Sequence, residues 1–215
     1  MSALGDRLRL KRALRRLPLA LRHRVIAGLP RGILGQDFLL DRLPPGSIGA
    51  EIGVHEGDFS RRILQLIQPR RLHLVDPWAY EDASEYRHSL YGGKRGGDQL
   101  RLDQRYAGVV ASFQEEIARG QVQLHRQSSE AASATFADDY FDWVYLDGNH
   151  TYACVFSDLT RYCPKVRRGG LIAGDDYGVN GWWNGGVTRA VDEFAAGGLV
   201  ELVEIRRRQF ILRRR

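Results

Sequence analysis

The chain has 215 residues, 43% of them hydrophobic, which is enough for one domain with one buried core. No apolar run approaches the roughly 20 residues that span a bilayer. The arginine-rich start lacks the apolar stretch of a secretory signal, so we expect a soluble, cytoplasmic protein. The net charge of +6 arises at the ends, with nine Lys or Arg against one Asp in residues 1–31 and six Arg in the last ten residues. The remainder is acidic, at about −8, which argues against a nucleic-acid partner.

Along the chain, apolar segments alternate with patterns of helical spacing. Between the first two segments, Phe59, Ile63 and Leu66 recur on one face of a helix. Strands that alternate with helices predict a parallel sheet covered on both faces. Further on, residues 199–205 and 209–214 are joined by arginines and predict a closing antiparallel pair. The five segments expected as parallel strands are 47–54, 71–78, 121–127, 141–148 and 169–177.

Two segments stand apart from this alternation. Residues 1–31 are basic and carry leucines among arginines, which predicts an amphipathic segment ahead of the main domain, residues 32–215. We expect this segment to pack on its own domain or on a second subunit of a homo-oligomer, in preference to a membrane surface. Residues 79–103, rich in Tyr, Gly and charge, form a long insertion of the kind that usually shapes a substrate site.

The ends of the first two strands carry the features of a nucleotide-type site. In an open parallel sheet, ligands bind beyond the carboxyl ends of the strands. Gly53 and Gly57 allow the backbone to approach a ligand and the next helix to pack closely. Asp76 ends the second strand 23 residues after Gly53, near the roughly 20-residue offset of an acid that holds a ribose diol. The alternative is that the glycines only form a tight turn and that Asp76 caps the next helix.

Three carboxylates follow the fourth and fifth strands. If these strands are neighbours, Asp147 lies about 5–10 Å from Asp175 and Asp176. Unpaired anions so close repel each other, and a hard divalent cation bound by oxygen ligands would relieve the repulsion. The alternative is that one aspartate caps a turn and another faces solvent.

Five segments of the sequence are the most distinctive: "GAEIGVHEGDFS" (49–60), "LVDPW" (74–78), "DWVYLDGNHTYACVFSDL" (142–159), "GGLIAGDDY" (169–177) and "GVTRAVDEF" (186–194). Together they resemble class I S-adenosylmethionine-dependent methyltransferases. Within that class they resemble the divalent-metal-dependent O-methyltransferases of sugar and natural-product pathways, of the macrocin and cephalosporin type. The resemblance covers roughly residues 46–212, although His55 stands where the commonest pattern has its middle glycine.

The resemblance implies a Rossmann-like α/β fold with seven strands, mostly parallel with an antiparallel C-terminal strand, and S-adenosylmethionine as cofactor. Glu51 and Gly53 would border its methionine part, and Asp76 would hold the ribose hydroxyls. Trp78 would lie against the adenine, with Ser128 or Ser129 at the adenine edge. The full set of cofactor-binding residues that it implies is Glu51, Gly53, Val54, Gly57, Asp76, Trp78, Ser128, Ser129 and Asp147.

The resemblance also implies a reaction. Asp147, Asp175 and Asp176 are similar to the family's ligands for Mg²⁺ or Mn²⁺, and a bound cation would acidify an acceptor hydroxyl. His150 would then accept the proton as general base, although it equally suits a role in orienting its loop. The expected acceptor is a small molecule, a sugar or a glycoside. Trp182 and Trp183 are expected either to line or gate its pocket or to pack over the sheet edge.

Other functions share part of this pattern. A metal-independent small-molecule or RNA methyltransferase would keep the cofactor residues, but the acidic middle of the chain disfavours RNA. A nicotinamide-dependent oxidoreductase would share the glycine turn and Asp76 without needing three carboxylates after the fourth and fifth strands. A non-catalytic binding module would share the fold. The identity of the acceptor is not contained in the pattern.

Overall fold

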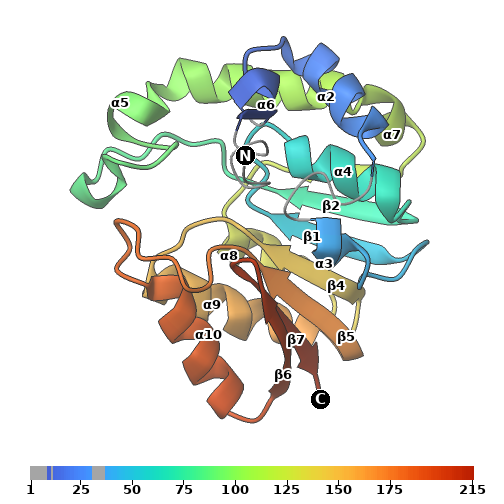
Figure 1. Ribbon diagram of the computed structural model, residues 1–215, viewed down its shortest axis with the longest axis vertical. Coiled ribbons are helices and arrows are strands. Elements are labelled where there is room, and N and C mark those ends of the chain that lie inside the picture. The colour runs from blue at the N-terminus through green and yellow to red at the C-terminus, as the bar shows by residue number, and fades with distance from the viewer. Residues whose placement is uncertain (1–8, 11, 31–36) are drawn as a thin grey trace.

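Seven strands form one sheet, in the order β3-β2-β1-β4-β5-β7-β6, in the computed structural model, which describes residues 9–10, 12–30 and 37–215 (Figure 1). The first five strands pair in parallel, and β7 runs antiparallel to both β5 and β6. The predicted Rossmann-like fold and its antiparallel end are therefore confirmed. The strands are β1 (Ile48–Ile52), β2 (Arg71–Val75), β3 (Val122–His125), β4 (Phe141–Leu146), β5 (Val166–Gly174), β6 (Val200–Arg206) and β7 (Gln209–Arg214).

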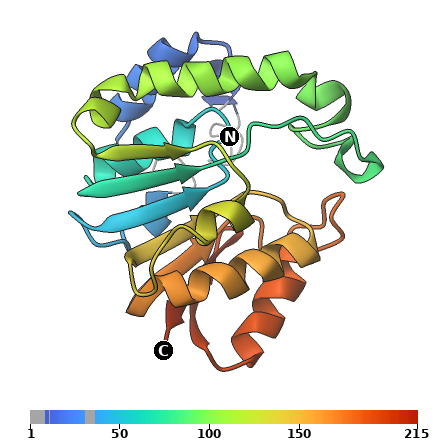
Figure 2. The same cartoon turned by 180° about the vertical axis from the view of Figure 1, so that it is seen from behind.

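Helices cover both faces of the sheet (Figures 1 and 2). Alternate residues of β4 face the two layers, because successive side chains of a strand point to opposite sides. Trp143 and Tyr145 pack in the core beneath α4 and α6, whereas Val144 and Leu146 pack with α9 and α10. The helical elements are α2 (Leu19–Gly28), α3 (Asp37–Leu40), α4 (Asp58–Leu66), η1 (Ser84–Tyr86), α5 (Gly93–Gly96), α6 (Gln99–Ser112), α7 (Gln114–Ala118), α8 (Ser129–Ser133), α9 (Tyr152–Tyr162), η2 (Cys163–Lys165) and α10 (Gly186–Ala196).

The strand order reverses between β1 and β4, which lie side by side in the middle of the sheet. This is the point at which open α/β sheets bind their ligands. Strands β4 and β5 are also neighbours, with Leu146 opposite Gly174 at their carboxyl ends. The residues that follow these three strands therefore gather at one edge, as the sequence predicts.

The N-terminal segment packs on its own domain where it is described. Helix α2 lies against α4 and α6, and it buries Arg22, His23 and Ile26. Residues 1–8, 11 and 31 of the predicted segment lie outside the described residues. In the described part of the chain, no helix is both long and apolar enough to cross a membrane.

The insertion after β2 contains η1 and α5 and ends earlier than expected. Asp98 caps α6, since its side chain accepts a hydrogen bond from the Arg101 amide at 2.9 Å. Asp103, the expected last residue of the insertion, thus already lies in α6. The insertion lies on the same side of the molecule as the loop between β5 and α10 (Figures 1 and 2).

Candidate active site

A cavity of about 760 Å³ opens beyond the carboxyl ends of β1, β2 and β4. This volume lies within the range of sites that hold a cofactor or a drug-sized ligand, roughly 300–1,000 Å³. Among the residues predicted for the site, Gly57, Trp78, Asp175 and Asp176 do not line this cavity. Those that line it are Glu51, Gly53, Val54, Asp76, Ser128, Ser129, Asp147 and His150.

Two glycines shape the turn between β1 and α4. Gly53 has φ +94°, and a Cβ at this position would lie 2.2 Å from the carbonyl oxygen of Asp147. Only glycine fits there, because the ends of β1 and β4 touch through their backbones. Gly57 has φ +75° at the start of α4, where a Cβ would lie 2.7 Å from the ring of Phe113. Gly57 therefore serves the turn and the packing of the helix, and not the cavity wall.

Glu51 is a buried carboxyl group on the cavity wall, only 1% exposed. Burial raises its pKa well above 4.5; the hydrogen bond from Ser60 opposes this shift, and the charges of Asp147 and Asp76 add to it. The Ser60 Oγ donates to Glu51 Oε2 at 2.5 Å. A buried acid of this kind gains from a cationic partner, and so it fits the ammonium and sulfonium charges of S-adenosylmethionine.

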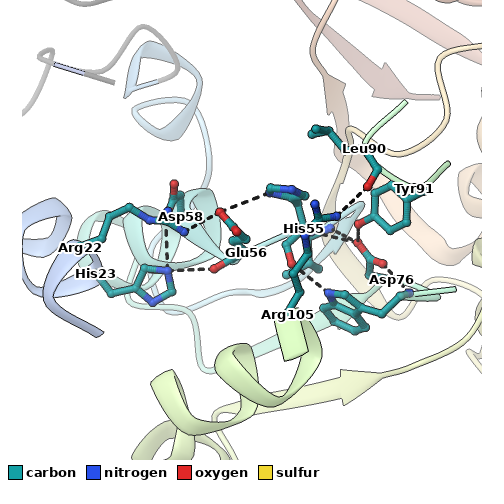
Figure 3. A network of polar contacts seen from close by, with 11 residues as sticks. Arg22, His23, His55, Glu56, Asp58, Asp76, Leu90, Tyr91 and Arg105 are labelled. Carbon is teal, nitrogen blue, oxygen red and sulfur yellow. Dashed lines mark hydrogen bonds and ion pairs between the residues drawn. The ribbon is translucent and has the colours of Figure 1, made fainter. Parts of the chain in front are cut away.

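Asp76 is equally buried, and protein groups already surround its carboxylate (Figure 3). Its Oδ2 accepts from the amides of Val54 and His55, both at 2.9 Å, and from the Tyr91 hydroxyl. Its Oδ1 accepts from the Trp78 amide at 2.8 Å. The carboxylate lines the cavity and at the same time holds the turns that follow β1 and β2.

Trp78 does not take the place expected for it beside the adenine. Its indole is fully buried in the core, packs against Tyr106 with ring centroids 5.1 Å apart, and donates from Nε1 to the His55 carbonyl at 2.9 Å. The bond between its amide and Asp76 turns the chain at this point, with φ +39°. A large indole whose N–H is hydrogen-bonded contributes more to stability in the core than on a cavity wall in contact with solvent.

Ser128 and Ser129 lie on the far wall of the cavity, at the start of α8. Ser128 caps this helix by accepting from the Ala131 amide at 3.2 Å. Ser129 Oγ donates at 2.5 Å to Asp158 Oδ1 on α9. Burial raises the pKa of Asp158 to about 6, although Ser129 and Arg161 oppose that shift. Asp158 lines the cavity as well, and sequence analysis did not single it out.

The three aspartates after β4 and β5 gather around His150. The His150 Nε2 lies 3.2 Å from Asp147 Oδ1 and 3.4 Å from Asp176 Oδ2. The other oxygen of Asp176 contacts the guanidinium of Arg208, which comes from the turn between β6 and β7. Asp175 accepts from the Asp176 amide at 2.8 Å through Oδ1. The predicted juxtaposition of the carboxylates is therefore present, with the His150 imidazole and the Arg208 guanidinium among them.

The closeness of these charged groups shifts the pKa values of both His150 and Asp147. Burial raises the pKa of Asp147 to about 6; His150 opposes that shift, whereas Asp175 and Asp176 increase it. For His150, burial alone lowers the pKa, but the hydrogen bond and charge of Asp147, followed by the charges of Asp176 and Asp175, outweigh it. The pKa of His150 is consequently raised above 6.5.

The side chains at these strand ends meet only part of the requirements of a divalent cation. Carboxylate oxygens are suitable ligands, and burial together with the charges of Asp175 and Asp176 raises the pKa of Asp147. Among the described residues, however, no group of three or more acidic, His or Cys side chains converges closely enough to hold a metal ion. Arg208 and His150 take the positions beside Asp176 that a cation would need. The side chains in this arrangement do not fit a metal.

Aromatic residues from two loops line the part of the cavity next to His150. Trp183 packs on His150 with ring centroids 4.7 Å apart, and Trp182 faces Tyr86 of the insertion at 6.4 Å. The Asn149 side chain donates to the Tyr86 hydroxyl at 2.7 Å. The tryptophans thus line a pocket, one of the two roles predicted for them, and the insertion forms its opposite wall.

Tyr91 and Arg208 belong to the site but carry no mark in the sequence. Tyr91 lies in the long insertion, and Arg208 lies in a turn where both Arg207 and Arg208 have positive φ. No motif marks either position. Only their places in the chain point to the site: Tyr91 follows β2, and Arg208 lies in the turn that joins β6 and β7.

A seven-stranded sheet of this order, with a cofactor-sized cavity at its switch point and buried acids after β1 and β2, defines a class I S-adenosylmethionine-dependent methyltransferase. Residues 50–177, more than half of the chain, match the family model described as a methyltransferase domain. The chain belongs to this family and is an S-adenosylmethionine-dependent methyltransferase. No curated protein matches it.

Solved structures of methyltransferases share the fold at low sequence identity. Cofactor-bound Rv0187 from MTB is 16% identical, with a TM-score of 0.60 over 91% of this chain and 87% of that one. The SAH-bound methyltransferase PaMTH1 of Podospora anserina is 14% identical, with a TM-score of 0.58 over 96% and 94% of the two chains. The O-methyltransferase NovP is 20% identical, with a TM-score of 0.55 over 90% and 79%.

Proposed function

We propose that this protein transfers a methyl group from S-adenosylmethionine to a hydroxyl oxygen of a small molecule, with His150 as the general base. The observation that carries the proposal is the position of His150 on the cavity wall, bonded to Asp147 and packed on Trp183. A base in this place lies next to both the cofactor region and the aromatic pocket. The similarity to the O-methyltransferase NovP is in line with an oxygen acceptor.

The neighbours of His150 determine which of its ring nitrogens carries the proton. Its Nε2 faces two carboxylates, so that nitrogen carries the proton and Nδ1 is left to accept one. S-adenosylmethionine supplies a methyl group on a positively charged sulfur. The acceptor oxygen bonds to the methyl carbon as the carbon–sulfur bond breaks, and its electron pair stays on the sulfur. The hydroxyl proton passes to His150, and the resulting imidazolium is stabilised by Asp147 and Asp176.

The pocket between the insertion and the tryptophan loop supports a cyclic polar acceptor, a sugar or a glycoside. Tyr86, Trp182 and Trp183 offer flat apolar faces, and Asn149 adds a polar group beside them. Flat aromatic faces combined with a few placed polar groups are typical of small-molecule sites.

The predicted cation at Asp147, Asp175 and Asp176 stays a prediction, and no step of the proposed methyl transfer depends on it. Arg208 must leave Asp176 before a cation can take its place. Its side chain is 59% exposed, which gives it room to do so.

The decisive experiment is a methyl-transfer assay on a panel of sugars and glycosides with wild type and His150→Gln. Glutamine keeps a hydrogen bond to Asp147 but accepts no proton, so kcat should fall about 10²–10⁴-fold. Binding of S-adenosylhomocysteine, measured by calorimetry, should stay the same. His88→Gln, on the insertion side of the same cavity, should change KM and not kcat. A His150→Gln enzyme with wild-type kcat would refute the base, and methylation of RNA in place of hydroxyl compounds would refute the acceptor class.

A second arm addresses the cation. Titration with Mn²⁺ compares wild type, the double variant Asp175→Asn with Asp176→Asn, and Arg208→Met. The metal prediction requires binding in wild type, loss in the double variant and tighter binding in Arg208→Met, because the methionine leaves Asp176 free. Full activity after chelation, with no Mn²⁺ bound, would show that the carboxylates serve only His150 and Arg208.

A further inference from the structure

One oxygen of Asp76 is already crowded with protein donors. An ionised carboxylate offers about four lone-pair sites, two on each oxygen. Oδ2 accepts from the amides of Val54 and His55 and from the hydroxyl of Tyr91, whereas Oδ1 accepts only from the Trp78 amide. Figure 3 shows His55 and Tyr91 beside Asp76. A ribose diol that bonds to both oxygens of Asp76 must therefore displace a donor from Oδ2.

Only one of the four donors is free to leave. Three are backbone amides of tight turns, where His55 and Trp78 have positive φ, and moving them would dismantle the turns after β1 and β2. The fourth is a side-chain hydroxyl that a change of rotamer can remove. Burial and the charge of Asp76 raise the pKa of Tyr91 well above 10, so the hydroxyl stays protonated and donates.

We infer that the Tyr91 hydroxyl occupies the ribose position on Asp76 and that cofactor binding displaces it. Tyr91 thereby acts as a positioning residue between two halves of the cavity. The cofactor half lies around Glu51 and Asp76, and the acceptor half lies around Tyr86, Trp182 and Trp183. The inference rests on the proposed use of S-adenosylmethionine and on the ribose role that the family resemblance implies for Asp76.

The link runs through the backbone of the insertion. The Glu81 amide donates to the Tyr91 carbonyl at 2.8 Å, and Arg105 on α6 donates to the Leu90 carbonyl at 2.7 Å. The same insertion supplies Tyr86 to the aromatic pocket. A rotamer change of Tyr91 therefore alters the packing of a segment that also shapes the acceptor site, and the cofactor is expected to bind before the acceptor.

The first test is calorimetric titration of S-adenosylhomocysteine into wild type, Tyr91→Phe and Tyr80→Phe. Phenylalanine cannot bond to Asp76, so the ligand no longer has to break that bond and should bind about tenfold more tightly. Tyr80 lies in the same insertion but does not line the cavity, and its variant should bind as wild type does. Weaker or unchanged binding by Tyr91→Phe would overturn the inference, because the hydroxyl would then assist the ribose or play no part.

A second test does not depend on the folding of a variant. In wild type, hydrogen exchange of residues 79–97 should change when adenosine is added and stay constant with 2′,3′-dideoxyadenosine, which lacks the displacing hydroxyls. The same response to both ligands would also overturn the inference.

The tests separate this inference from the function on which it rests. If wild type binds no S-adenosylhomocysteine, the proposed function itself fails. If Asp76→Asn binds it as tightly as wild type, Asp76 does not hold the ribose, and only the Tyr91 inference is lost.

Discussion

The two halves of the site hold their acidic side chains in different ways. After β1 and β2, Asp76 takes three of its four hydrogen bonds from backbone amides. After β4 and β5, Asp147 and Asp176 pair with the side chains of His150 and Arg208. Backbone donors are fixed by the fold, whereas side-chain partners can exchange. The first half is therefore suited to constant binding of one ligand, and the second to moving protons and charge.

The two halves meet at Gly53, and a substitution there should disturb the structure of both. In Gly53→Ala the new Cβ would collide with the backbone of Asp147 and Gly148, which has no flexible end to move aside. We expect the free energy of unfolding to fall by about 2–4 kcal/mol, together with a loss of S-adenosylhomocysteine binding. Urea unfolding and calorimetry measure the two effects.

Gly46→Ala is the matched control. Gly46 also has a positive φ, +66°, but a Cβ there meets nothing within 4 Å. It should cost only the backbone strain of about 1 kcal/mol and leave ligand binding unchanged. Equal effects of the two substitutions would mean that the close contact between Gly53 and the backbone of Asp147 does not contribute to stability.

The cofactor half is also held from outside by α2, and removing that support should weaken it alone. Arg22 is 4% exposed, and it donates to Asp58 at 2.7 Å and to Glu56 at 2.8 Å, on either side of Gly57 (Figure 3). Arg22→Met should lower the free energy of unfolding by about 2 kcal/mol, because it removes two charge-assisted hydrogen bonds. Binding of S-adenosylhomocysteine should weaken several-fold.

Arg24→Met, at an exposed position of the same helix, provides the comparison and should change stability by less than about 0.5 kcal/mol. Thermal unfolding of the two variants measures the difference. If both variants behave alike, α2 does not support the cofactor turn.

The smallest expected effect lies inside the domain at β2 and β3, where His73 contacts His125 at 2.9 Å and Tyr140 at 3.1 Å. Burial, followed by the charge of His125, lowers the pKa of His73 to about 3. The unfolded chain takes up its proton near pH 6.5, so this contribution to stability is complete above that pH and declines toward pH 3. Between pH 7 and 5.5 the loss should be about 1 kcal/mol.

The contribution is isolated by comparing wild type with His73→Phe. The phenylalanine should pack among Phe136 and Phe141, which already surround the imidazole, and it has no titratable group. Urea unfolding at the two pH values should show a smaller pH dependence in the variant. An identical pH dependence would place the titration elsewhere.

Much of the site could be predicted from the sequence, because it is built from the residues at the carboxyl end of each strand. Glu51, Gly53, Asp76, Asp147 and His150 all line the cavity as expected. Trp78 could not be placed in this way. Its direction depends on the bond between its own amide and Asp76 and on the core space beside Tyr106, and neither is visible in a local pattern.

Periodicity and spacing along the chain were sufficient for the order of strands and helices, and the motifs at the strand ends were sufficient for the family. The partners of these acidic side chains became visible only in the folded chain: Tyr91 on Asp76, Arg208 on Asp176, and Ser129 on Asp158. Each pair joins segments whose distance in space is set by the packing of the whole sheet. No local pattern records that distance, and these partners are the groups that set the charge and binding capacity of the site.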